Sequence, residues 1–355
     1  MGRPEMMPQW DCVKSVQESV FACVGRTALI EFGNIRRDEK ISTRILGKLE
    51  YMNPTGSLKD RIYCEMITRA IEKGHLKPGM EILEASTGNA GIACAFVATR
   101  LGYPVTIVVP SGMSQERMKM IRAYGGKIIN TPGGESDVDL SIKKIEELKR
   151  SAPGKYWEPG QFANPDNVNA HYKTTGPEIW EQTKGNVDCF VASQGTGGTI
   201  TGVGKFLREK NSRVLLYAVE PAEAAILSKR RWGTHKIEGI GDGFVPRNLH
   251  LKQLTGVVTT TSEEAIKMAQ RLSTTEGIFC GISSGCNVAA AVKVARKHPE
   301  LGVIVTMIND TGQRYFTTEL FGEPKSVEIP EREHRLDEYS LAELEKFQSS
   351  LEIIE

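Results

Sequence analysis

Short apolar runs rich in β-branched residues alternate along the chain with longer stretches in which apolar positions recur every three or four residues. The short runs predict strands, and the longer stretches predict amphipathic helices. The predicted strands are residues 80–84, 105–109, 127–131, 189–192, 215–219, 257–260 and 303–308. The predicted helices are residues 58–73, 90–101, 115–124, 138–150, 201–209, 262–276 and 287–297. This alternation predicts an α/β fold with mainly parallel sheets flanked by helices.

Three stretches depart from the alternation. Residues 156–172 are rich in Asn, Pro and Gly, and residues 220–248 are rich in charge, Gly and Pro. Both are expected to be loops, and such loops often hold ligands at the carboxyl ends of parallel strands. Residues 323–355 form a charged C-terminal tail, and the weak helical periodicity of residues 341–354 suggests a docking helix.

Length and composition narrow the class of protein. A chain of 355 residues is long enough for two packed domains. Its 45 basic and 44 acidic residues nearly cancel, which gives no indication of a nucleic-acid or membrane partner. We find no apolar run of about 18 residues, so no membrane span is predicted.

The N-terminal stretch and the cysteines predict a cytoplasmic location. Residues 1–11 carry charges and prolines and contain no apolar core of a secretory signal. The seven cysteines form no CxxC pair, which is typical of reduced, buried thiols. The six histidines are scattered and pair with no cysteine at ligand spacing, so no metal site is predicted.

The first chemical motif is a turn-forming stretch that leads into a helix. Residues 53–61 read NPTGSLKDR, which places Lys59 in the first helical turn. The positive end of the helix dipole there disfavours the charged form of an amine, and a Schiff base forms from the neutral amine. An isolated lysine at a helix start is far more often a surface residue, so this motif alone is only suggestive.

Three further loops each follow an apolar run and open a helix. They are residues 86–91 (STGNAG), 195–199 (GTGGT) and 281–285 (GISSG). Glycines allow backbone N–H groups to approach an anion, and a helix N-terminus favours negative charge. Residues 195–199 lack the lysine of a P-loop and the spacing of a dinucleotide fold, so a small monophosphate is favoured. Each loop alone could be an ordinary capped turn, but four such motifs in one order are hard to explain separately.

The ordered set of motifs resembles the cysteine synthase and cystathionine β-synthase family, the fold-type II pyridoxal-phosphate enzymes. The pattern is most similar to O-acetylserine or O-phosphoserine sulfhydrylases. The resemblance covers about residues 22–321 and is carried by NPTGSLKDR, EASTGNAGIA, QFANPDN, TTGPEIW, GTGGTITG, HKIEGIGDGFVP and GISSG. It implies a smaller α/β domain at residues 47–165. It also implies a larger, cofactor-binding domain made of residues 1–46 and 166–322, and a homodimer.

The resemblance also implies a role for each motif. Lys59 would carry the pyridoxal 5′-phosphate as an internal aldimine and then remove the α-proton. Asn89 would bind the cofactor's 3′-hydroxyl, and Ser283 would face its pyridine nitrogen. The cofactor's phosphate would be held by Gly195, Thr196, Gly197, Gly198 and Thr199. The substrate would be bound by Ser86, Thr87, Gly88, Asn89 and Gln161, and covered by a loop at residues 239–243 that contains Gly239 and Asp242.

The implied reaction is β-replacement. O-acetylserine or O-phosphoserine would lose its β-substituent to give an aminoacrylate, and sulfide would add to give cysteine. A serine beside the pyridine nitrogen leaves the ring neutral, which suits prompt β-elimination better than transamination. As in some relatives, a serine acetyltransferase-like partner is a further expectation.

Several residues depart from the family pattern and leave the substrates open. Ala90 replaces a threonine, Gln194 replaces a small residue, and Asp242 stands where many O-acetylserine enzymes have alanine. A basic cluster at residues 229–231 would either bind a substrate phosphate or form a solvated loop. The alternatives are a cystathionine β-synthase-like reaction, another nucleophile such as cyanide or an amine, β-elimination of cysteine or serine, and a partner-binding regulatory homologue. A dehydratase is disfavoured by the motif pattern.

Overall fold

The computed structural model describes residues 17–86, 88–134, 137–322 and 335–355. Two sheets organise the fold. The larger sheet has seven strands in the order β1-β2-β10-β7-β8-β9-β11, and the smaller has four in the order β5-β4-β3-β6. Neighbouring strands are parallel except for β1 and β2. The predicted α/β class with mainly parallel sheets is confirmed.

The larger sheet comprises β1 (Leu29–Glu31), β2 (Arg44–Leu49), β7 (Cys189–Ser193), β8 (Leu215–Pro221), β9 (Gly256–Thr260), β10 (Val303–Ile308) and β11 (Glu352–Ile354). The smaller comprises β3 (Glu81–Ala85), β4 (Val105–Pro110), β5 (Lys127–Thr131) and β6 (Tyr156–Trp157). The helices are α1 (Gly33–Asp38), α2 (Lys59–Glu72), α3 (Asn89–Arg100), α4 (Gln115–Ala123), α5 (Val138–Ser151), α6 (Pro165–Ala170), α7 (Gly176–Gln182), α8 (Gly198–Lys210), α9 (Ile226–Lys229), α10 (Ser262–Arg271), α11 (Ile282–Lys297) and α12 (Glu338–Phe347).

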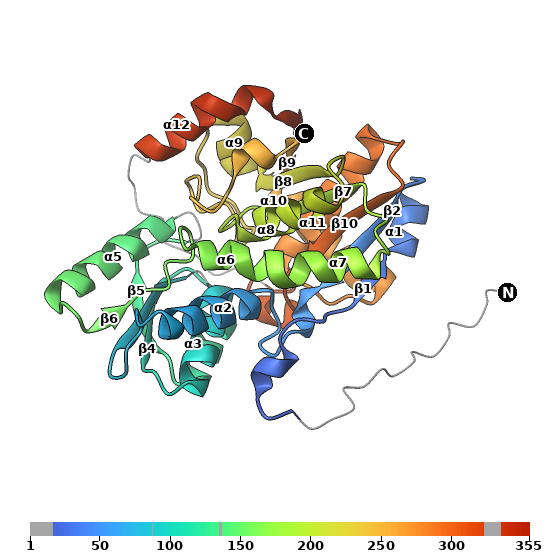
Figure 1. Ribbon diagram of the computed structural model, residues 1–355. Helices are drawn as coiled ribbons and strands as arrows, with labels where there is room; N and C mark the ends of the chain where they lie inside the picture. Colours follow the sequence, from blue (N-terminus) through green and yellow to red (C-terminus); the bar gives the residue numbers. More distant parts are fainter. Residues whose placement is uncertain (1–16, 87, 135–136, 323–334) are drawn as a thin grey trace.

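Both sheets have a hydrophobic core on each face. Successive side chains of a strand point to opposite sides, so neighbouring residues of one strand join different cores. In β3, Ile82 joins the core beneath α2 and α3, whereas the adjacent Leu83 joins the core beneath α5. In β7, Val191 packs on the side of α10 and α11, and Phe190 packs on the side of α8. Figure 1 shows the two sheets side by side, with helices around each.

The chain before residue 58 contains elements that the apolar pattern does not predict. β2 pairs with β10 along its whole length, so residues 47–49, beyond the expected domain boundary, lie in the larger sheet. Its pattern is disguised by Lys48, which is fully buried and forms an ion pair with Glu178 in α7 at 2.7 Å. A buried lysine is rare unless it is paired, and the partner lies far away in the sequence.

The two stretches expected to be loops contain regular structure. Residues 156–172 include β6, α6 and the start of a π-helical turn (His171–Thr175). Asn164 caps α6 by accepting a hydrogen bond from the Asp166 N–H at 2.9 Å, and Pro165 occupies the first helical position. Residues 220–248 include the end of β8 and the short helix α9. Asn164 and Pro165, which indicated a loop, are therefore helix-start residues, whereas residues 230–248 contain no helix or strand, as predicted.

The C-terminal tail packs against the body of the larger sheet. α12 buries Leu344 in the core on the α8 side of that sheet, and β11 adds a parallel strand beside β9. The helix begins at Glu338, three residues before the predicted periodicity, because Asp337 accepts a hydrogen bond from the Ser340 N–H. Figure 1 shows α12 beside α9, far from α2 and α3.

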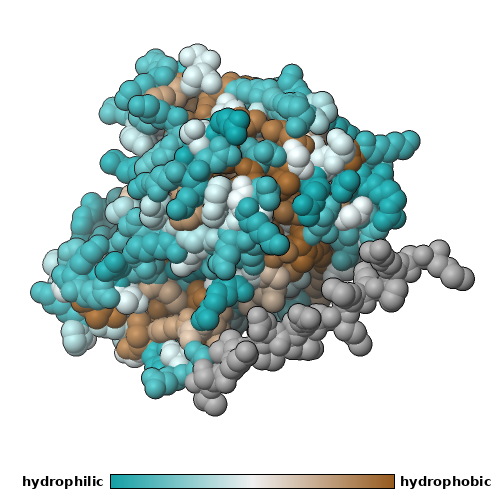
Figure 2. All heavy atoms as spheres, turned by 45° about the vertical axis from the view of Figure 1, so that its right-hand side comes forward, coloured by the Kyte–Doolittle hydropathy of each residue, from teal (hydrophilic) through white to brown (hydrophobic). Residues whose placement is uncertain are grey.

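The surface is mostly hydrophilic on the face shown in Figure 2, with apolar side chains exposed between the hydrophilic ones. No described helix is long and apolar enough to cross a membrane. Within the described ranges, no group of three or more His, Cys, Asp or Glu side chains is placed to hold a metal ion.

Candidate active site

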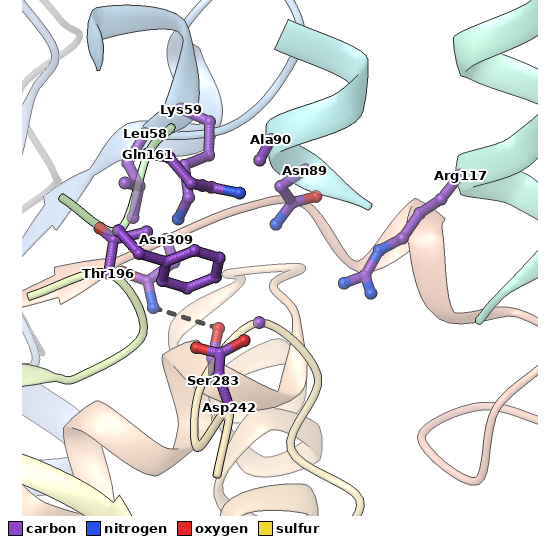
Figure 3. A pocket seen from close by; sticks show the side chains of 12 residues that line it. Leu58, Lys59, Asn89, Ala90, Arg117, Gln161, Thr196, Asp242, Ser283 and Asn309 are labelled. Atoms are coloured by element: carbon purple, nitrogen blue, oxygen red, sulfur yellow. Dashed lines mark hydrogen bonds between the residues drawn. The ribbon is translucent and has the colours of Figure 1, made fainter. Parts of the chain in front are cut away.

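Two adjoining hollows lie where the chain leaves β3, β7 and β10 (Figure 3). The first, with the space at its open mouth, encloses about 500 Å³ and the second about 340 Å³. Helices and loops attached to both sheets line the first, with Leu58, Lys59, Asn89, Ala90, Arg117, Gln161, Phe162, Thr196, Gly239, Asp242, Ser283 and Asn309. The second is lined by Leu58, Lys59, Ala192, Ser193, Gly195, Thr196, Gly197, Thr199, Gly239, Ile240 and Asn309. Of the predicted site residues that the structure describes, the first hollow is lined by Lys59, Asn89, Gln161, Thr196, Gly239, Asp242 and Ser283, and the second also by Gly195, Gly197 and Thr199. Neither hollow is lined by Ser86, Gly88 or Gly198.

Lys59 is the first residue of α2 and lines both hollows. The turn before it is fixed by the next residue, because Asp60 accepts hydrogen bonds from the backbone N–H and the hydroxyl of Thr55. The Leu58 N–H also donates to the carbonyl of Asn309, at the end of β10, at 3.0 Å. Lys59 is thus held between the start of α2 and the carboxyl end of a strand.

Buried charges anchor the same helix from behind. The Arg61 guanidinium donates to Glu50 and to Glu178, each at 2.7 Å. Burial alone would raise the pKa of the Glu178 carboxyl, but Arg61 and Lys48 lower it to about 2. These carboxylates are therefore ionised at neutral pH, and their pairing fixes α2 on β2 and α7.

Asn89 is the first residue of α3, and its side-chain amide is held at both ends. Its Nδ2 donates to Asp310 at 2.6 Å, and its Oδ1 accepts from Arg314. In the preceding loop, Ser86 Oγ accepts from the Gly88 N–H at 2.9 Å and from the Gly91 N–H at 2.7 Å. Thr87 lies outside the described residues. The loop is thus organised by its own serine.

Residues 195–199 form the N-terminus of α8, a helix of 13 residues. Gly197 has φ +77°, and a side chain there would meet the backbone of Leu249, so the turn requires glycine. Thr196 accepts a hydrogen bond from Asn167 at 3.0 Å, while Gly198 packs directly against Asn167. The helix N-terminus and the Thr196 and Thr199 side chains give this end of the site the character of an anion cradle.

A buried histidine supports this cradle from outside the hollows. His171 Nε2 lies 3.1 Å from Thr199 Oγ1, and its Nδ1 lies 2.9 Å from Thr175 Oγ1. Burial, assisted by the charge of Arg61, lowers the pKa of His171 to about 3. The imidazole is therefore neutral at physiological pH and orients Thr199 without adding charge.

Ser283 is the second residue of α11, and its Oγ accepts a hydrogen bond from Asn309 Nδ2 at 3.1 Å (Figure 3). The residue before the helix, Gly281, packs against Asp310 and the Tyr315 ring, so a side chain there would overlap both. Ser283 and Lys59 therefore line the same hollow from α11 and α2.

Gln161 and the loop at residues 239–243 complete the wall. Gln161 Nε2 donates to the carbonyl of Ala85, at the end of β3, at 2.9 Å. Gly239, Gly241 and Gly243 all have positive φ, at 92°, 72° and 88°. Asp242 lies between the last two, is buried, and turns its carboxylate into the hollow (Figure 3). Burial raises the pKa of Asp242 to about 7, although the charge of Lys59 opposes the rise.

Sequence reasoning missed four residues that line the first hollow: Leu58, Arg117, Phe162 and Asn309. Phe162 lies inside the QFANPDN motif, and Asn309 directly follows a parallel strand, a position that often carries function. Arg117 gives no such signal, because it reads as one charge among several on an amphipathic helix. Only the fold shows that it is buried.

The basic cluster at residues 229–231 does not line either hollow. Lys229 forms an ion pair with Glu355 at 2.6 Å, and Arg230 donates to Gln348 at 2.9 Å. Arg231 donates to the carbonyl of Ala222 at 2.5 Å. The cluster therefore binds the C-terminal tail and its own loop, which gives no support to a role in holding a substrate phosphate.

The residues present fit pyridoxal 5′-phosphate. An amine from Lys59, an anion cradle at the N-terminus of α8 and a hydroxyl from Ser283 are the groups that its aldehyde, phosphate and ring nitrogen require. The two hollows share Leu58, Lys59, Thr196, Gly239 and Asn309 as lining residues. The amine and the cradle consequently border one continuous space.

Known proteins share this sequence and fold. The family model described as "Pyridoxal-phosphate dependent enzyme" matches residues 20–310. Cysteine synthase 3 of Caenorhabditis elegans is 44% identical over 302 residues, 84% of this chain and 88% of that protein. A cysteine synthase structure from Entamoeba histolytica has a TM-score of 0.85 at 36% identity, covering 97% of this chain and 99% of that one. A hydrogen sulfide-producing enzyme from Fusobacterium nucleatum has a TM-score of 0.80 at 36% identity, covering 84% and 100%.

The fold and the site define a pyridoxal-phosphate enzyme of fold-type II. The chain belongs to the pyridoxal-phosphate dependent enzyme family and, within it, to the cysteine synthase family. The predictions of the family, of the cofactor and of a β-replacing enzyme are confirmed.

Proposed function

We propose that this enzyme makes cysteine from sulfide and either O-acetylserine or O-phosphoserine. The observation that carries the proposal is the pair of adjoining hollows lined by Lys59, the anion cradle, Ser283 and Asn89, each supplied by a different element. The similarity to cysteine synthases supports the choice of substrates.

The cofactor would be held by Lys59, by Asn89, by Ser283 and by Gly195, Thr196, Gly197, Gly198 and Thr199. When bound, pyridoxal 5′-phosphate supplies the electron withdrawal that makes the substrate's α-proton acidic. Ser283 offers the ring nitrogen a neutral hydroxyl, which leaves that nitrogen without a permanent proton. The residues thus favour elimination over prolonged carbanion chemistry.

The substrate carboxylate would lie against Ser86, Thr87, Gly88 and Asn89, with Gln161 beside it. Ser86 Oγ already accepts two backbone N–H bonds, so its own hydrogen remains available to donate. Gln161 uses one amide hydrogen on Ala85 and retains a second for the substrate. Fixing the carboxylate sets the Cα–H bond toward the lysine amine.

Lys59 would then move the proton. Its amine takes the α-proton as the bond from Cβ to the acetate or phosphate oxygen breaks. Hydrosulfide forms the new bond to Cβ, and Lys59 returns the proton to Cα. The loop at residues 239–243 covers this space and excludes water, which would otherwise compete with sulfide.

The direct test is product analysis with purified, cofactor-loaded protein. O-acetylserine or O-phosphoserine is mixed with sulfide, and cysteine is quantified together with released acetate or phosphate. We expect one cysteine for each leaving group released by the preferred substrate. Absence of cysteine from both substrates would contradict the proposal.

Asp242 favours a second candidate, elimination or replacement on serine or cysteine. Hydroxide is a much poorer leaving group than acetate, so loss of the hydroxyl group of serine depends on protonation by an acid, whereas loss of acetate does not. A buried carboxyl with a pKa of about 7 in the wall of the hollow is a suitable acid. A panel of serine, cysteine and homocysteine, with sulfide release and cystathionine as readouts, separates this candidate from the first.

We also propose a homodimer, a cytoplasmic location and a serine acetyltransferase-like partner, each from the family resemblance. The dimer is further supported by an aromatic cluster of Phe279, Phe316 and Phe321, whose side chains are exposed and pack against one another. Light scattering of the purified chain tests the dimer, and co-purification with a serine acetyltransferase tests the partner. We also propose that a smaller domain spans residues 47–165. The larger domain would combine residues 1–46 with residues 166–322.

A further inference from the structure

Arg117 lies where the substrate loop meets the glycine-rich loop. It belongs to α4, yet its side chain is 1% exposed and its guanidinium points into the first hollow (Figure 3). Its stem packs directly on Gly88, where any side chain would overlap it. A helix that would otherwise present its charges to solvent therefore places one of them against the Ser86–Asn89 loop.

The guanidinium has three partners on the opposite side of the site. It forms an ion pair with Glu238, the residue that directly precedes Gly239. It also donates to the Tyr315 hydroxyl at 2.6 Å, and its carbon lies 4.7 Å from the centre of the Tyr315 ring. Arg117 thus joins α4 to the start of the glycine-rich loop and to the turn that follows β10.

The same contacts continue to Asn89. The Tyr315 hydroxyl donates to Asp310 Oδ2 at 2.8 Å, and this oxygen also accepts from Asn89 Nδ2 at 2.6 Å. Arg117 Nη2 lies 3.7 Å from the same oxygen. One guanidinium consequently balances the charge of Glu238 on one side and of the Asp310 carboxylate, which orients Asn89, on the other.

Because Arg117 and the groups it contacts are largely buried, none of these groups is easily replaced by another. Removing one partner of a buried pair leaves a charge without compensation, so the remaining groups move or take up water. The planar guanidinium also fixes the directions of its donors, which a lysine ammonium does not. The positions of Glu238 and Gly88 are therefore linked through one rigid group.

We propose that Arg117 is a positioning residue that couples the placement of the loop at residues 239–243 to substrate binding at Gly88 and Asn89, with Glu238 as its partner. The proposal rests on the proposed function for the identity of the substrate. Because coupling between two sites is reciprocal, substrate that orders one loop orders the other.

A double-mutant cycle with Arg117→Met, Glu238→Gln and the double variant tests the coupling. Methionine keeps the apolar stem on Gly88, and glutamine keeps the shape of Glu238. We expect each single change to raise the half-saturating concentration of O-acetylserine about tenfold, the effect of one charge-assisted hydrogen bond. The half-saturating concentration of the double variant should be no higher than that of Arg117→Met. Arg117→Lys should raise this concentration less than Arg117→Met does.

Two further readouts separate positioning from folding. Deuterium uptake by residues 239–243 should rise in Arg117→Met and Glu238→Gln, while the cofactor's visible absorbance stays close to that of the wild type and the melting temperature falls by only a few degrees. Glu116→Gln is the matched control, since Glu116 lies next to Arg117 on α4 but bonds to Thr317. It should change neither the half-saturating concentration nor the uptake.

Additive effects in the cycle, or unchanged uptake and half-saturation in both single variants, would overturn the coupling. A collapse of the melting temperature in Glu238→Gln would assign the pair to folding and also overturn it. The uptake measurement needs no turnover. A wild-type enzyme inactive on every serine derivative therefore defeats the proposed function separately from this inference.

Discussion

Lys59 carries the strongest expectation at the scale of single residues. It lines both hollows at the start of α2, and the ion pairs behind that helix are made by Arg61 with Glu50 and Glu178. We expect Lys59→Ala to lower turnover by at least about 10³-fold, because both the attachment of the cofactor and the proton transfer are lost. The visible absorbance of the bound cofactor should change as well.

The fold should survive this change. Chemical denaturation should give a free energy of unfolding within about 1 kcal/mol of the wild type. Lys73→Ala, just after the other end of α2, is the control and should keep full activity. Full activity in Lys59→Ala would refute the assignment of the site.

Asp242 predicts a pH dependence that distinguishes substrates. Its folded-state pKa of about 7 lies above the ordinary value of 3.8 because the carboxyl is buried. The protonated acid is therefore present below about pH 7 and is lost as the pH rises through that value. Elimination from serine or cysteine, measured as kcat/KM without added nucleophile, should fall above about pH 7.

The matched variant is Asp242→Asn, which keeps the shape and cannot donate an acidic proton. It should lose the falling limb of that pH profile and lower the rate on serine by about 10²-fold or more. Its rate on O-acetylserine should change much less. Equal losses on both substrates would show that Asp242 acts only by packing.

At the scale of elements, the amphipathic helices α4 and α5 begin at the predicted residues, 115 and 138, whereas α8 and α11 begin three and five residues before their predicted starts, inside the glycine-containing motifs. α3, α8 and α11 each follow a motif in which the turn, the anion-binding N–H groups and the helix start are encoded together. β2 and the burial of Arg117 were not predictable, because each depends on a partner supplied by another element. Periodicity records which face is apolar, but it does not record an ion pair with a residue far away in the sequence.

The C-terminal tail supports a stability prediction at this scale. Leu344 of α12 is fully buried, whereas Leu341 in the same helix is 42% exposed. We expect Leu344→Ala to lower the free energy of unfolding by about 2–5 kcal/mol, as for other buried leucines. Leu341→Ala should cost about 0.5 kcal/mol or less, and denaturant titration compares the two.

A functional effect should accompany the loss, since Ser340 Oγ of α12 accepts a hydrogen bond from the Val245 N–H at 2.9 Å, shortly after the glycine-rich loop. Leu344→Ala should therefore increase deuterium uptake in residues 239–245. If the tail made no contribution to the fold, Leu344→Ala would change neither the free energy of unfolding nor the deuterium uptake of residues 239–245.

At the scale of the whole molecule, the two sheets meet at the site, and buried charges hold them there. The motifs predicted many of the residues that line the hollows, because the carboxyl ends of parallel strands gather on one side of a sheet. The motif order did not predict the buried ion pairs that hold the elements around the hollows in place. The charged network is made by Lys48 of β2, Glu50 of the turn that follows, Arg61 of α2 and Glu178 of α7. Only the folded chain brings these elements together.

This network makes the stability of the molecule depend on acid. The folded-state pKa of Glu178 is about 2, below the ordinary value of 4.5, because Arg61 and Lys48 outweigh the effect of burial. Its contribution is therefore fully present above about pH 4.5 and is lost as the pH falls toward 2. Glu178→Gln should lower the free energy of unfolding by about 3 kcal/mol at pH 7. The difference from the wild type should shrink toward zero near pH 2.

Glu181→Gln, an exposed position in the same helix, should differ from the wild type by less than about 0.5 kcal/mol at either pH. A difference between Glu178→Gln and the wild type that stays constant across this range, measured by urea unfolding at each pH, would show that Glu178 contributes by packing and not by charge.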